Sequence, residues 1–232
     1  MSYVLPVAAP PGVPVHGADG ALFPVHRIYC VGRNYVEHAV EMGFTGREPP
    51  FFFLKPADAV LPVRSGAVGE MHYPSLTHDL HHEVELVVAI GKGGRDIAAN
   101  DALAHVWGYA VGLDMTRRDL QGEMKKQGRP WCIGKAFEES APIGEVRRAA
   151  ECLIDADTQI RLEVNGQTRQ QSRIGRLIWS IPEIIEHLSA AWTLAPGDLI
   201  YTGTPEGVAA VVRGDTLSAS VDGVGSLQIK LV

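Results

Sequence analysis

The stretch "HHEVELVVAIG" places two carboxylates, Glu83 and Glu85, one residue apart within an apolar run. Side chains of a β-strand alternate between its two faces, so these two would point to the same side. Neighbouring carboxylates raise each other's cost of ionisation. Two explanations stay open: a solvent-exposed strand face, which the spacing alone favours, or a site for a hard cation such as Mg²⁺, Mn²⁺ or Ca²⁺.

A hard-cation site needs at least one further carboxylate, and Asp114 is the candidate. It ends a second apolar run, "WGYAVGLD", which has the pattern of a buried strand. Many strands simply end at an aspartate, so Asp114 by itself does not decide between the two explanations.

A second chemical pair lies in "GRNYVEHAVEMG". His38 and Glu41 stand at positions i and i+3, hence on one face of an expected helix over residues 34–43. A carboxylate beside a histidine raises its basicity and fixes its tautomer, which is how a general base for water is built. On spacing alone, a surface ion pair is the more common explanation.

Other patterns do not match known sites. His72, His78, His81 and His82 cluster before the glutamates, but their spacing fits no standard zinc site. "GRPWCIGKAF" resembles a P-loop only faintly, because Ala136 stands where a Ser or Thr is needed. The sequence contains no GxSxG elbow.

The elements that must position these groups are mostly strands. Apolar runs and turn signals predict strands, hairpins or strand pairs over 27–32, 51–56, 82–90, 107–114, 160–171, 199–204 and 216–232. A helix over 101–106 would be capped by Asn100, and one ending at Gly128 would start with a capping box of Thr116 and Asp119. Ser180 with Glu183 predicts another helix through about residue 191.

Composition restricts the class of protein. The 232 residues are 46% hydrophobic and 21% charged, with a net charge of −6, which argues against nucleic-acid binding. No apolar stretch is long enough to span a membrane, and the proline-rich N-terminus does not fit a signal helix. Three widely spaced cysteines favour a cytoplasmic protein with free thiols. The pattern indicates a β-rich α+β domain preceded by an N-terminal arm.

From about residue 26 to the C-terminus, the chain resembles the fumarylacetoacetate hydrolase family, in particular its small acylpyruvate hydrolases. The motifs that carry the resemblance include "VGRNYVEHAVEMG", "FFFLKPADAV", "HHEVELVVAIGK", "GYAVGLDMTRRDLQ", "KKQGRPWCIGKAF", "VNGQTRQ" and "GDLIYTGTPEGV". The resemblance implies a β-rich mixed β-roll or sandwich with short helices over 26–232, an arm over 1–25, and a homodimer. It also implies one divalent cation per subunit, with Mg²⁺ expected and Mn²⁺ or Ca²⁺ as alternatives.

The resemblance also implies roles for individual residues. It implies metal ligation by Glu83, Glu85 and Asp114, and catalysis by His38, Glu41 and Lys135. It implies substrate contacts for Arg118, Gln121 and Thr204, and the charge of the expected substrate adds Arg33 as a further substrate-binding candidate. Lys55 of "FLKP" is expected near the site.

The expected reaction is cleavage of the C3–C4 bond of a 2,4-dioxo acid, an acylpyruvate. His38 supported by Glu41 would activate water, Lys135 would stabilise the oxyanion, and the cation would stabilise the pyruvate enolate. Fumarylpyruvate, cleaved to fumarate and pyruvate in gentisate-type aromatic catabolism, is the expected substrate, with Arg33 or Arg47 binding its second carboxylate. The alternatives are oxaloacetate decarboxylation, isomerisation of a dioxo acid on the same site, or a non-catalytic metal- or ligand-binding β domain.

Overall fold

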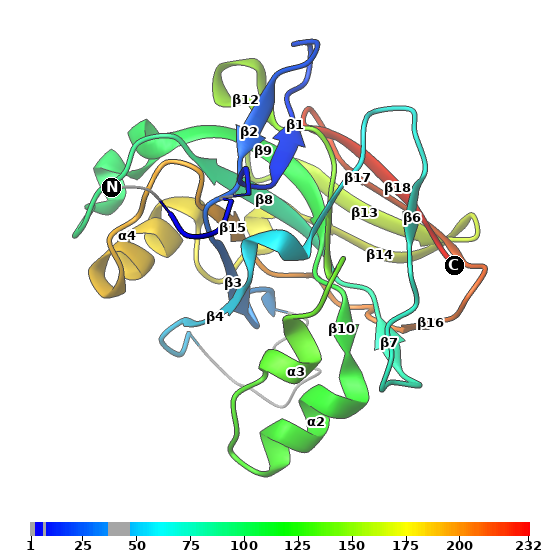
Figure 1. Ribbon diagram of the computed structural model, residues 1–232. Helices are drawn as coiled ribbons and strands as arrows, with labels where there is room; N and C mark the ends of the chain where they lie inside the picture. Colours follow the sequence, from blue (N-terminus) through cyan, green and yellow to red (C-terminus); the bar gives the residue numbers. More distant parts are fainter. Residues whose placement is uncertain (1–2, 7, 37–46) are drawn as a thin grey trace.

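The computed structural model describes residues 3–6, 8–36 and 47–232. A large mixed sheet occupies the centre of the molecule (Figure 1), and its eight strands position the candidate site. In sheet order these strands are β4 (Phe51–Lys55), β3 (Ile28–Gly32), β15 (Leu199–Tyr201), β8 (Val84–Ile90), β9 (Val106–Leu113), β11 (Ala141–Ile143) and β5 (Val60–Pro62), with β12 (Arg147–Arg148) also paired to β9.

A five-stranded sheet packs against the large sheet. Its order is β14 (Gln167–Arg173), β13 (Gln159–Val164), β17 (Thr216–Val221), β18 (Gly225–Leu231) and β6 (Gly69–Met71). Two small sheets complete the β structure: β10 (Thr116–Arg117), β7 (Leu80–His81) and β16 (Ala210–Val211) form one, and β1 (Gly12–Pro14) with β2 (Leu22–Pro24) the other. These sheets confirm the β-rich α+β class.

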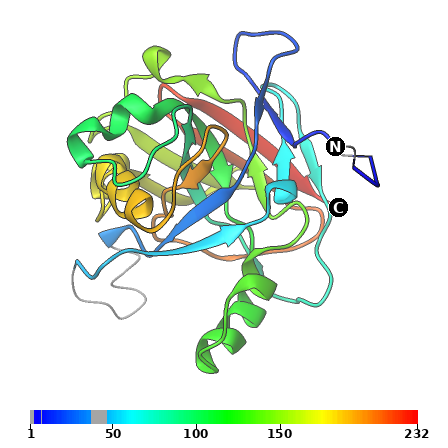
Figure 2. The same ribbon diagram turned by 60° about the vertical axis from the view of Figure 1, so that its left-hand side comes forward.

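The helices are few and short. They are α2 (Arg118–Lys126), α3 (Cys132–Lys135) and α4 (Ile181–Ala191), with 3₁₀ turns η1 (Ala57–Ala59), η2 (Ala99–His105), η3 (Ala149–Glu151) and η4 (Ile174–Arg176). Helices α2 and α3 extend from one end of the molecule, and the β1–β2 hairpin lies at the opposite end (Figures 1 and 2). No helix in the described part of the chain is both long and apolar enough to cross a membrane.

The side chains of β8 alternate between its two faces as predicted for 82–90, but neither face of the strand is exposed to solvent. Val84, Leu86 and Val88 belong to one hydrophobic cluster, which continues into the five-stranded sheet and α4. Val87 and Ala89 belong to a second cluster on the opposite face. Glu83 and Glu85 are only 6% and 2% exposed, so the explanation by a solvent-exposed strand face is wrong.

Several predicted local signals are confirmed. Asn165 and Gly166 both take positive φ, as the turn between β13 and β14 requires. Ser180 and Glu183 form the predicted capping box at the start of α4. The tail folds into the β17–β18 hairpin.

Two predicted helix starts are wrong. Asn100 lies inside η2, whose preceding residue makes no side-chain cap. The Thr116 hydroxyl donates to the Asp114 carbonyl, and Asp119 accepts from the Thr77 hydroxyl, so they form no capping box for α2. The Asp119 side chain is bound by a residue distant in sequence, Thr77, and the Thr116 hydroxyl by the carbonyl two residues before it. The helix predicted over 34–43 lies almost entirely outside the described residues.

Candidate metal and substrate site

Strand pairing brings the three predicted carboxylates together. Glu83 precedes β8, Glu85 lies within it, and Asp114 follows β9 directly. Since β8 and β9 are antiparallel neighbours, the start of one lies beside the end of the other, and the Asp114 amide donates to the Glu83 carbonyl at 2.9 Å. One carboxylate oxygen from each residue lies within 4.8 Å of the others.

This oxygen set fits a hard divalent cation. Carboxylate oxygens that bind one Mg²⁺, Mn²⁺ or Ca²⁺ lie at about 2.0–2.6 Å from the ion, so they come within roughly twice that distance of each other. Burial, together with the charges of Asp114 and Glu83, raises the pKa of Glu85 well above its usual range. A dication would compensate this unfavourable grouping of negative charges.

Two buried lysines contact the same carboxylates. Lys135 Nζ donates to Glu83 Oε2 at 2.8 Å and to Asp114 Oδ2 at 2.7 Å. Burial opposes its positive charge, but the charges of Asp114 and Glu83 outweigh this and raise the pKa of Lys135, so it is an ammonium at neutral pH. Lys55 Nζ lies 2.9 Å from Asp114 Oδ1. Lys55, which the sequence placed only near the site, is therefore in direct contact with it.

The first turn of α2 supplies two polar side chains. Arg118 forms an ion pair with Glu83 and donates from Nη1 to Gln121 Oε1 at 2.6 Å. Gln121 is only 8% exposed, so its amide is held inside the site. The structure thus places both predicted substrate-contacting residues of α2 beside the carboxylates.

The segment after β15 forms another wall. Gly203 donates its N–H to Glu85 Oε2 at 2.7 Å, and Thr204 follows with 3% exposure. Gly203 has φ +104°, and a β-carbon there would lie 2.7 Å from the Asn34 β-carbon. This close approach lets the backbone reach the carboxylate and brings Thr204 to the cavity.

These groups surround a narrow cavity of about 30 Å³, roughly the volume of one water molecule. Arg33 enters it from the end of β3, at φ +57°, with its guanidinium 5.2 Å from the Phe51 ring centre. Trp131 meets Phe51 edge-on. The lining residues are Val31, Gly32, Arg33, Phe51, Phe53, Glu83, Glu85, Arg118, Gln121, Trp131, Lys135 and Thr204.

The predicted dyad of His38 and Glu41 lies outside the described residues, so its position stays a prediction. The chain on both sides of it is held by the segment before α4. Asn34 exchanges hydrogen bonds with the backbone of Trp179, and the Trp179 indole donates to the Glu48 carbonyl. Arg47 pairs with Glu183 at the start of α4.

The four clustered histidines do not converge. His72 contacts Glu139, and His81 contacts Asp79. His82 contacts Gln170, and burial lowers the pKa of His82 to about 4. In the described part of the chain, the one grouping of three side chains able to hold a metal is the carboxylate set.

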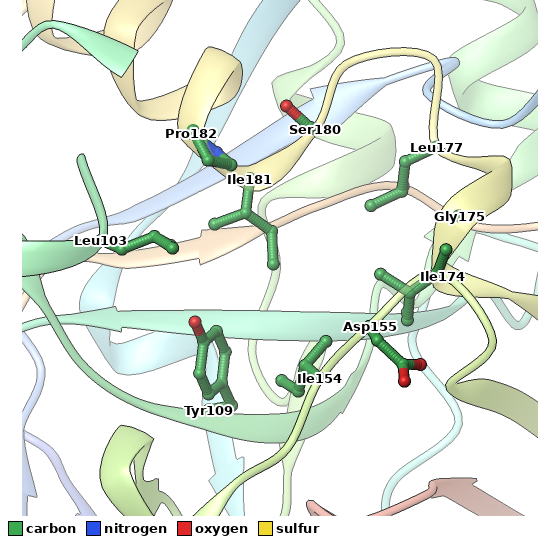
Figure 3. Close-up of a pocket in the computed structure, with 11 residues that line it drawn as sticks. Leu103, Tyr109, Ile154, Asp155, Ile174, Gly175, Leu177, Ser180, Ile181 and Pro182 are labelled. Carbon is green, nitrogen blue, oxygen red and sulfur yellow. The ribbon is translucent and has the colours of Figure 1, made fainter. Parts of the chain in front are cut away.

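A larger cavity, of about 300 Å³, lies away from these groups. In Figure 3, Ile181 projects between Leu103, Tyr109 and Ile154, with Ile174 and Leu177 on the other side. The lining is mainly aliphatic and includes no lysine, arginine or histidine. This cavity therefore offers space but no grouping suited to an anionic substrate.

Sequence reasoning missed two buried residues that hold the site in place, Asn34 and Gln170. Asn34 is fully buried and Gln170 is 1% exposed. Each bridges segments distant in sequence, and no local pattern marks such a bridge.

Comparisons with known proteins agree with this geometry. A family model described as "Fumarylacetoacetate (FAA) hydrolase C-terminal" matches residues 27–232. The fumarylpyruvate hydrolase of Pseudomonas aeruginosa, solved with Mn²⁺ and pyruvate, is 54% identical with a TM-score of 0.96, covering 100% of this chain and 99% of that one.

Two relatives known from their sequences carry different activities. A fumarylpyruvate hydrolase of a Ralstonia species is 46% identical over 182 residues, covering 78% of this chain and 92% of the relative. Oxaloacetate tautomerase YcgM of Escherichia coli is 41% identical over 211 residues, covering 90% of this chain and 94% of the relative.

Proposed function

The chain belongs to the fumarylacetoacetate hydrolase family, and from that premise we propose that it hydrolyses fumarylpyruvate to fumarate and pyruvate with one divalent cation. The observation that carries the proposal is the buried set of Glu83, Glu85 and Asp114, contacted by Lys135. The likeness to a fumarylpyruvate hydrolase that binds Mn²⁺ and pyruvate supports it.

In this proposal the three carboxylates hold the cation, with Mg²⁺ or Mn²⁺ expected. The bound cation would supply Lewis-acid stabilisation of negative charge at the 2-oxo acid end of the substrate. Lys55 holds the Asp114 carboxylate in place through its 2.9 Å ion pair. Arg118 holds the Glu83 carboxylate through an ion pair and orients the Gln121 amide.

The remaining steps fall to the chain's own residues. His38, supported by Glu41, would take a proton from the water that attacks the C4 carbonyl. The Lys135 ammonium would stabilise the oxyanion formed there. Thr204 would donate to the substrate's C1 carboxylate. The C3–C4 bond would then break with its electron pair passing to C3, C4 would become a carboxylate of fumarate, and the proton that His38 took from water would be returned to C3 to give pyruvate.

Charge supports a dianionic substrate. The charges of three carboxylates, a dication, Arg118 and Lys135 sum to about +1, which would balance a monoanionic substrate. The buried Lys55 raises this sum to about +2, which would balance a dianion. Arg33 lines the cavity, whereas Arg47, which pairs with Glu183 at the start of α4, does not belong to that lining. Arg33 is therefore the better candidate to bind the distal carboxylate of fumarylpyruvate.

A substrate panel tests the proposal. Fumarylpyruvate, acetylpyruvate and oxaloacetate are each incubated with enzyme in Mg²⁺, Mn²⁺ or EDTA, and pyruvate release is measured. We expect the highest kcat/KM with fumarylpyruvate and loss of activity in EDTA, restored by added cation. Equal rates in EDTA, or no cleavage of fumarylpyruvate, would contradict the proposal.

Oxaloacetate tautomerisation is the second candidate, favoured by the 41% identity to the tautomerase YcgM over 90% of this chain. It shares the need to stabilise an enolate but requires no activated water. The discriminating measurement follows the ultraviolet absorbance of enol-oxaloacetate in the His38→Ala variant. Hydrolysis should be lost in that variant, while tautomerisation, which does not consume water, should be retained.

Two further expectations complete the proposal. A homodimer in the cytoplasm is expected, and the three unpaired cysteines support a reducing compartment. Light scattering during gel filtration measures the assembly directly: a mass near twice the 25.0 kDa of one chain is expected.

A further inference from the structure

Gln170 is a buried polar residue in an otherwise exposed strand. It is the one buried position of β14, with 1% exposure. The register between β13 and β14 shifts between Leu162 and Glu163, at the level of Gln170. Such an irregularity re-aims side chains, and here it directs the amide toward the segment that carries Thr204.

Two backbone contacts fix which way the Gln170 amide points. Oε1 accepts the Val84 N–H at 3.1 Å, and Nε2 donates to the Pro205 carbonyl at 2.8 Å. A backbone N–H can only donate and a carbonyl can only accept, so the reversed amide would place like groups against each other at both contacts.

This orientation decides the two remaining hydrogens. Nε2 donates its second hydrogen to Thr204 Oγ1 at 2.8 Å. His82 Nδ1, 2.9 Å from Oε1, must carry its hydrogen toward that acceptor. The amide is therefore fully used, with two bonds donated and two accepted.

The consequence lies at Thr204. Because its oxygen accepts from Gln170, its own hydrogen cannot point back along the same contact. Thr204 lines the cavity with Glu83, Glu85 and Lys135. Among the described residues, no hydrogen bond uses the Thr204 hydroxyl as donor, so its hydrogen is available to an anion in the cavity.

We propose that Gln170 is a positioning residue that makes Thr204 a hydrogen-bond donor toward the substrate's carboxylate. The inference rests on the proposed function, in which Thr204 meets that carboxylate. It assigns Gln170 no contact with substrate: the effect passes through one hydroxyl group. The same amide bridges the strand of the carboxylates, at Val84, to the segment after β15, at Pro205.

The substitution that tests this is Gln170→Glu. A carboxylate keeps the acceptor that faces Val84 and removes the donors that face Thr204 and Pro205. The Thr204 hydroxyl would then donate to residue 170 and withdraw its hydrogen from the cavity. A hydrogen bond to a charged group changes a binding constant by a factor of about 10 to 100. We therefore expect KM for fumarylpyruvate to rise about 10-fold or more.

The decisive measurement places Gln170→Glu in three backgrounds: wild type, Thr204→Ser and Thr204→Val. Serine keeps the hydroxyl group, and valine replaces it with a methyl group while keeping nearly the shape of threonine. We expect the substitution to raise KM and the inhibition constant of pyruvate in the first two backgrounds and to change neither in Thr204→Val. Gln170→Met, which is uncharged and of similar length, repeats the series if the glutamate variant does not fold.

Three outcomes would overturn the inference. Equal increases in KM in all three backgrounds would mean that Gln170 supports the fold alone. A loss of metal affinity as large as the rise in KM would mean that it acts through the carboxylates. Wild-type enzyme that releases no pyruvate from fumarylpyruvate would remove both this inference and the proposed function, whereas the first two outcomes leave the proposed function intact.

Discussion

At the scale of single residues, the site depends on balance among buried charges. None of the three carboxylate residues Glu83, Glu85 and Asp114 is more than 6% exposed. The cationic side chains paired with this set are Lys55, Lys135 and Arg118. Removing one charged partner from such a group leaves the others uncompensated. Each substitution below therefore has an expected effect on metal binding, on turnover, or on both.

Glu85→Ala should abolish metal binding and activity together. It removes one of the three closely placed oxygens and the acceptor of the Gly203 N–H. Isothermal titration calorimetry with Mn²⁺ measures the first effect and pyruvate release the second. Full activity without measurable metal binding would contradict the assignment of these carboxylates as ligands.

Lys135→Met should separate the two effects. Methionine matches the length of lysine but cannot stabilise an oxyanion, and loss of such a donor costs about 10²–10³ in kcat. The carboxylates remain, so metal should still bind. Lys55→Met is the matched comparison: the proposed function gives Lys55 no contact with the oxyanion, only the 2.9 Å ion pair that holds Asp114 in place, so we expect metal affinity to fall and kcat to change less than in Lys135→Met. Equal effects of the two variants on kcat and metal affinity would show that the lysines share one role.

At the scale of elements, the site is assembled where several chain segments end together. Asn34, after β3, donates to the Thr202 carbonyl at the end of β15 and to the Trp179 carbonyl before α4, and accepts the Trp179 N–H. One buried side chain therefore joins three elements.

Asn34→Asp should destabilise the fold by about 3 kcal/mol. The carboxylate would place an acceptor against the two carbonyl groups that now accept from the amide, and each buried polar group left without a partner costs about 1–3 kcal/mol. Urea unfolding monitored by tryptophan fluorescence measures the change. A midpoint shift as small as that of an exposed control, Asp96→Asn, would contradict this role.

His82 should make stability fall below neutral pH. Burial lowers its pKa in the folded protein to about 4, from an ordinary value near 6.5. Above pH 6.5 both folded and unfolded forms are neutral; between about pH 6.5 and 4 only the unfolded form binds the proton, so stability is lost as pH falls. The loss is on the order of 3 kcal/mol. His82→Asn keeps an N–H donor but cannot take up this proton, so its urea midpoint should change less between pH 7 and pH 5 than that of the wild type, both measured in EDTA. The same pH dependence in both proteins would contradict this role of His82.

The helix start and the turns that the sequence predicted correctly depend on residues close to one another in the chain. Hairpin residues such as Asn165 and Gly166, and the capping pair of Ser180 and Glu183, act within a few residues and were read correctly. Thr116 and Asp119 fit a local pattern as well, but Asp114 and Thr77 took their hydrogen bonds. The contact of Asp119 with Thr77 joins segments 42 residues apart, which a single sequence does not display, and the local bond of Thr116 to the Asp114 carbonyl competes with the capping role.

The candidate site follows the same division. The spacing of Glu83 and Glu85 favoured an exposed face and left a hard-cation site open as the alternative; the resemblance to a family favoured that alternative, and the burial supports it. The contact of Lys55 with Asp114 and the bridge of Gln170 join strands that are not neighbours in sequence. Such bridges arise only when the sheets have formed, so no local rule could have predicted them.

At the scale of the whole molecule, the question is where the folded domain begins. The sequence predicts an arm over 1–25, and the family model starts at residue 27. In the structure, Val13, Phe23 and Val25 are buried in the second hydrophobic cluster, and Phe23 meets Trp107 at 5.3 Å between ring centres. Backbone hydrogen bonds also join His16 to Val146 and Val146 to Pro14.

Two truncations decide whether these residues form an arm or part of the core. Removing residues 1–10, whose described members are exposed, should change the melting temperature little. Removing 1–25 takes out several buried side chains and should cost at least about 5 kcal/mol, since loss of one buried Phe side chain alone costs about 3–5 kcal/mol. For a chain of this size that corresponds to a fall of about 10–20 °C.

Differential scanning calorimetry of both truncations in EDTA measures folding without the contribution of bound metal. Phe23→Ala in the full chain is the matched point variant, because it removes the contact with Trp107 and leaves the backbone bridges in place. It should lie between the two truncations in melting temperature. If removal of 1–25 leaves the melting temperature and the metal affinity unchanged, the first 25 residues are a dispensable arm, and the domain begins where the sequence predicted.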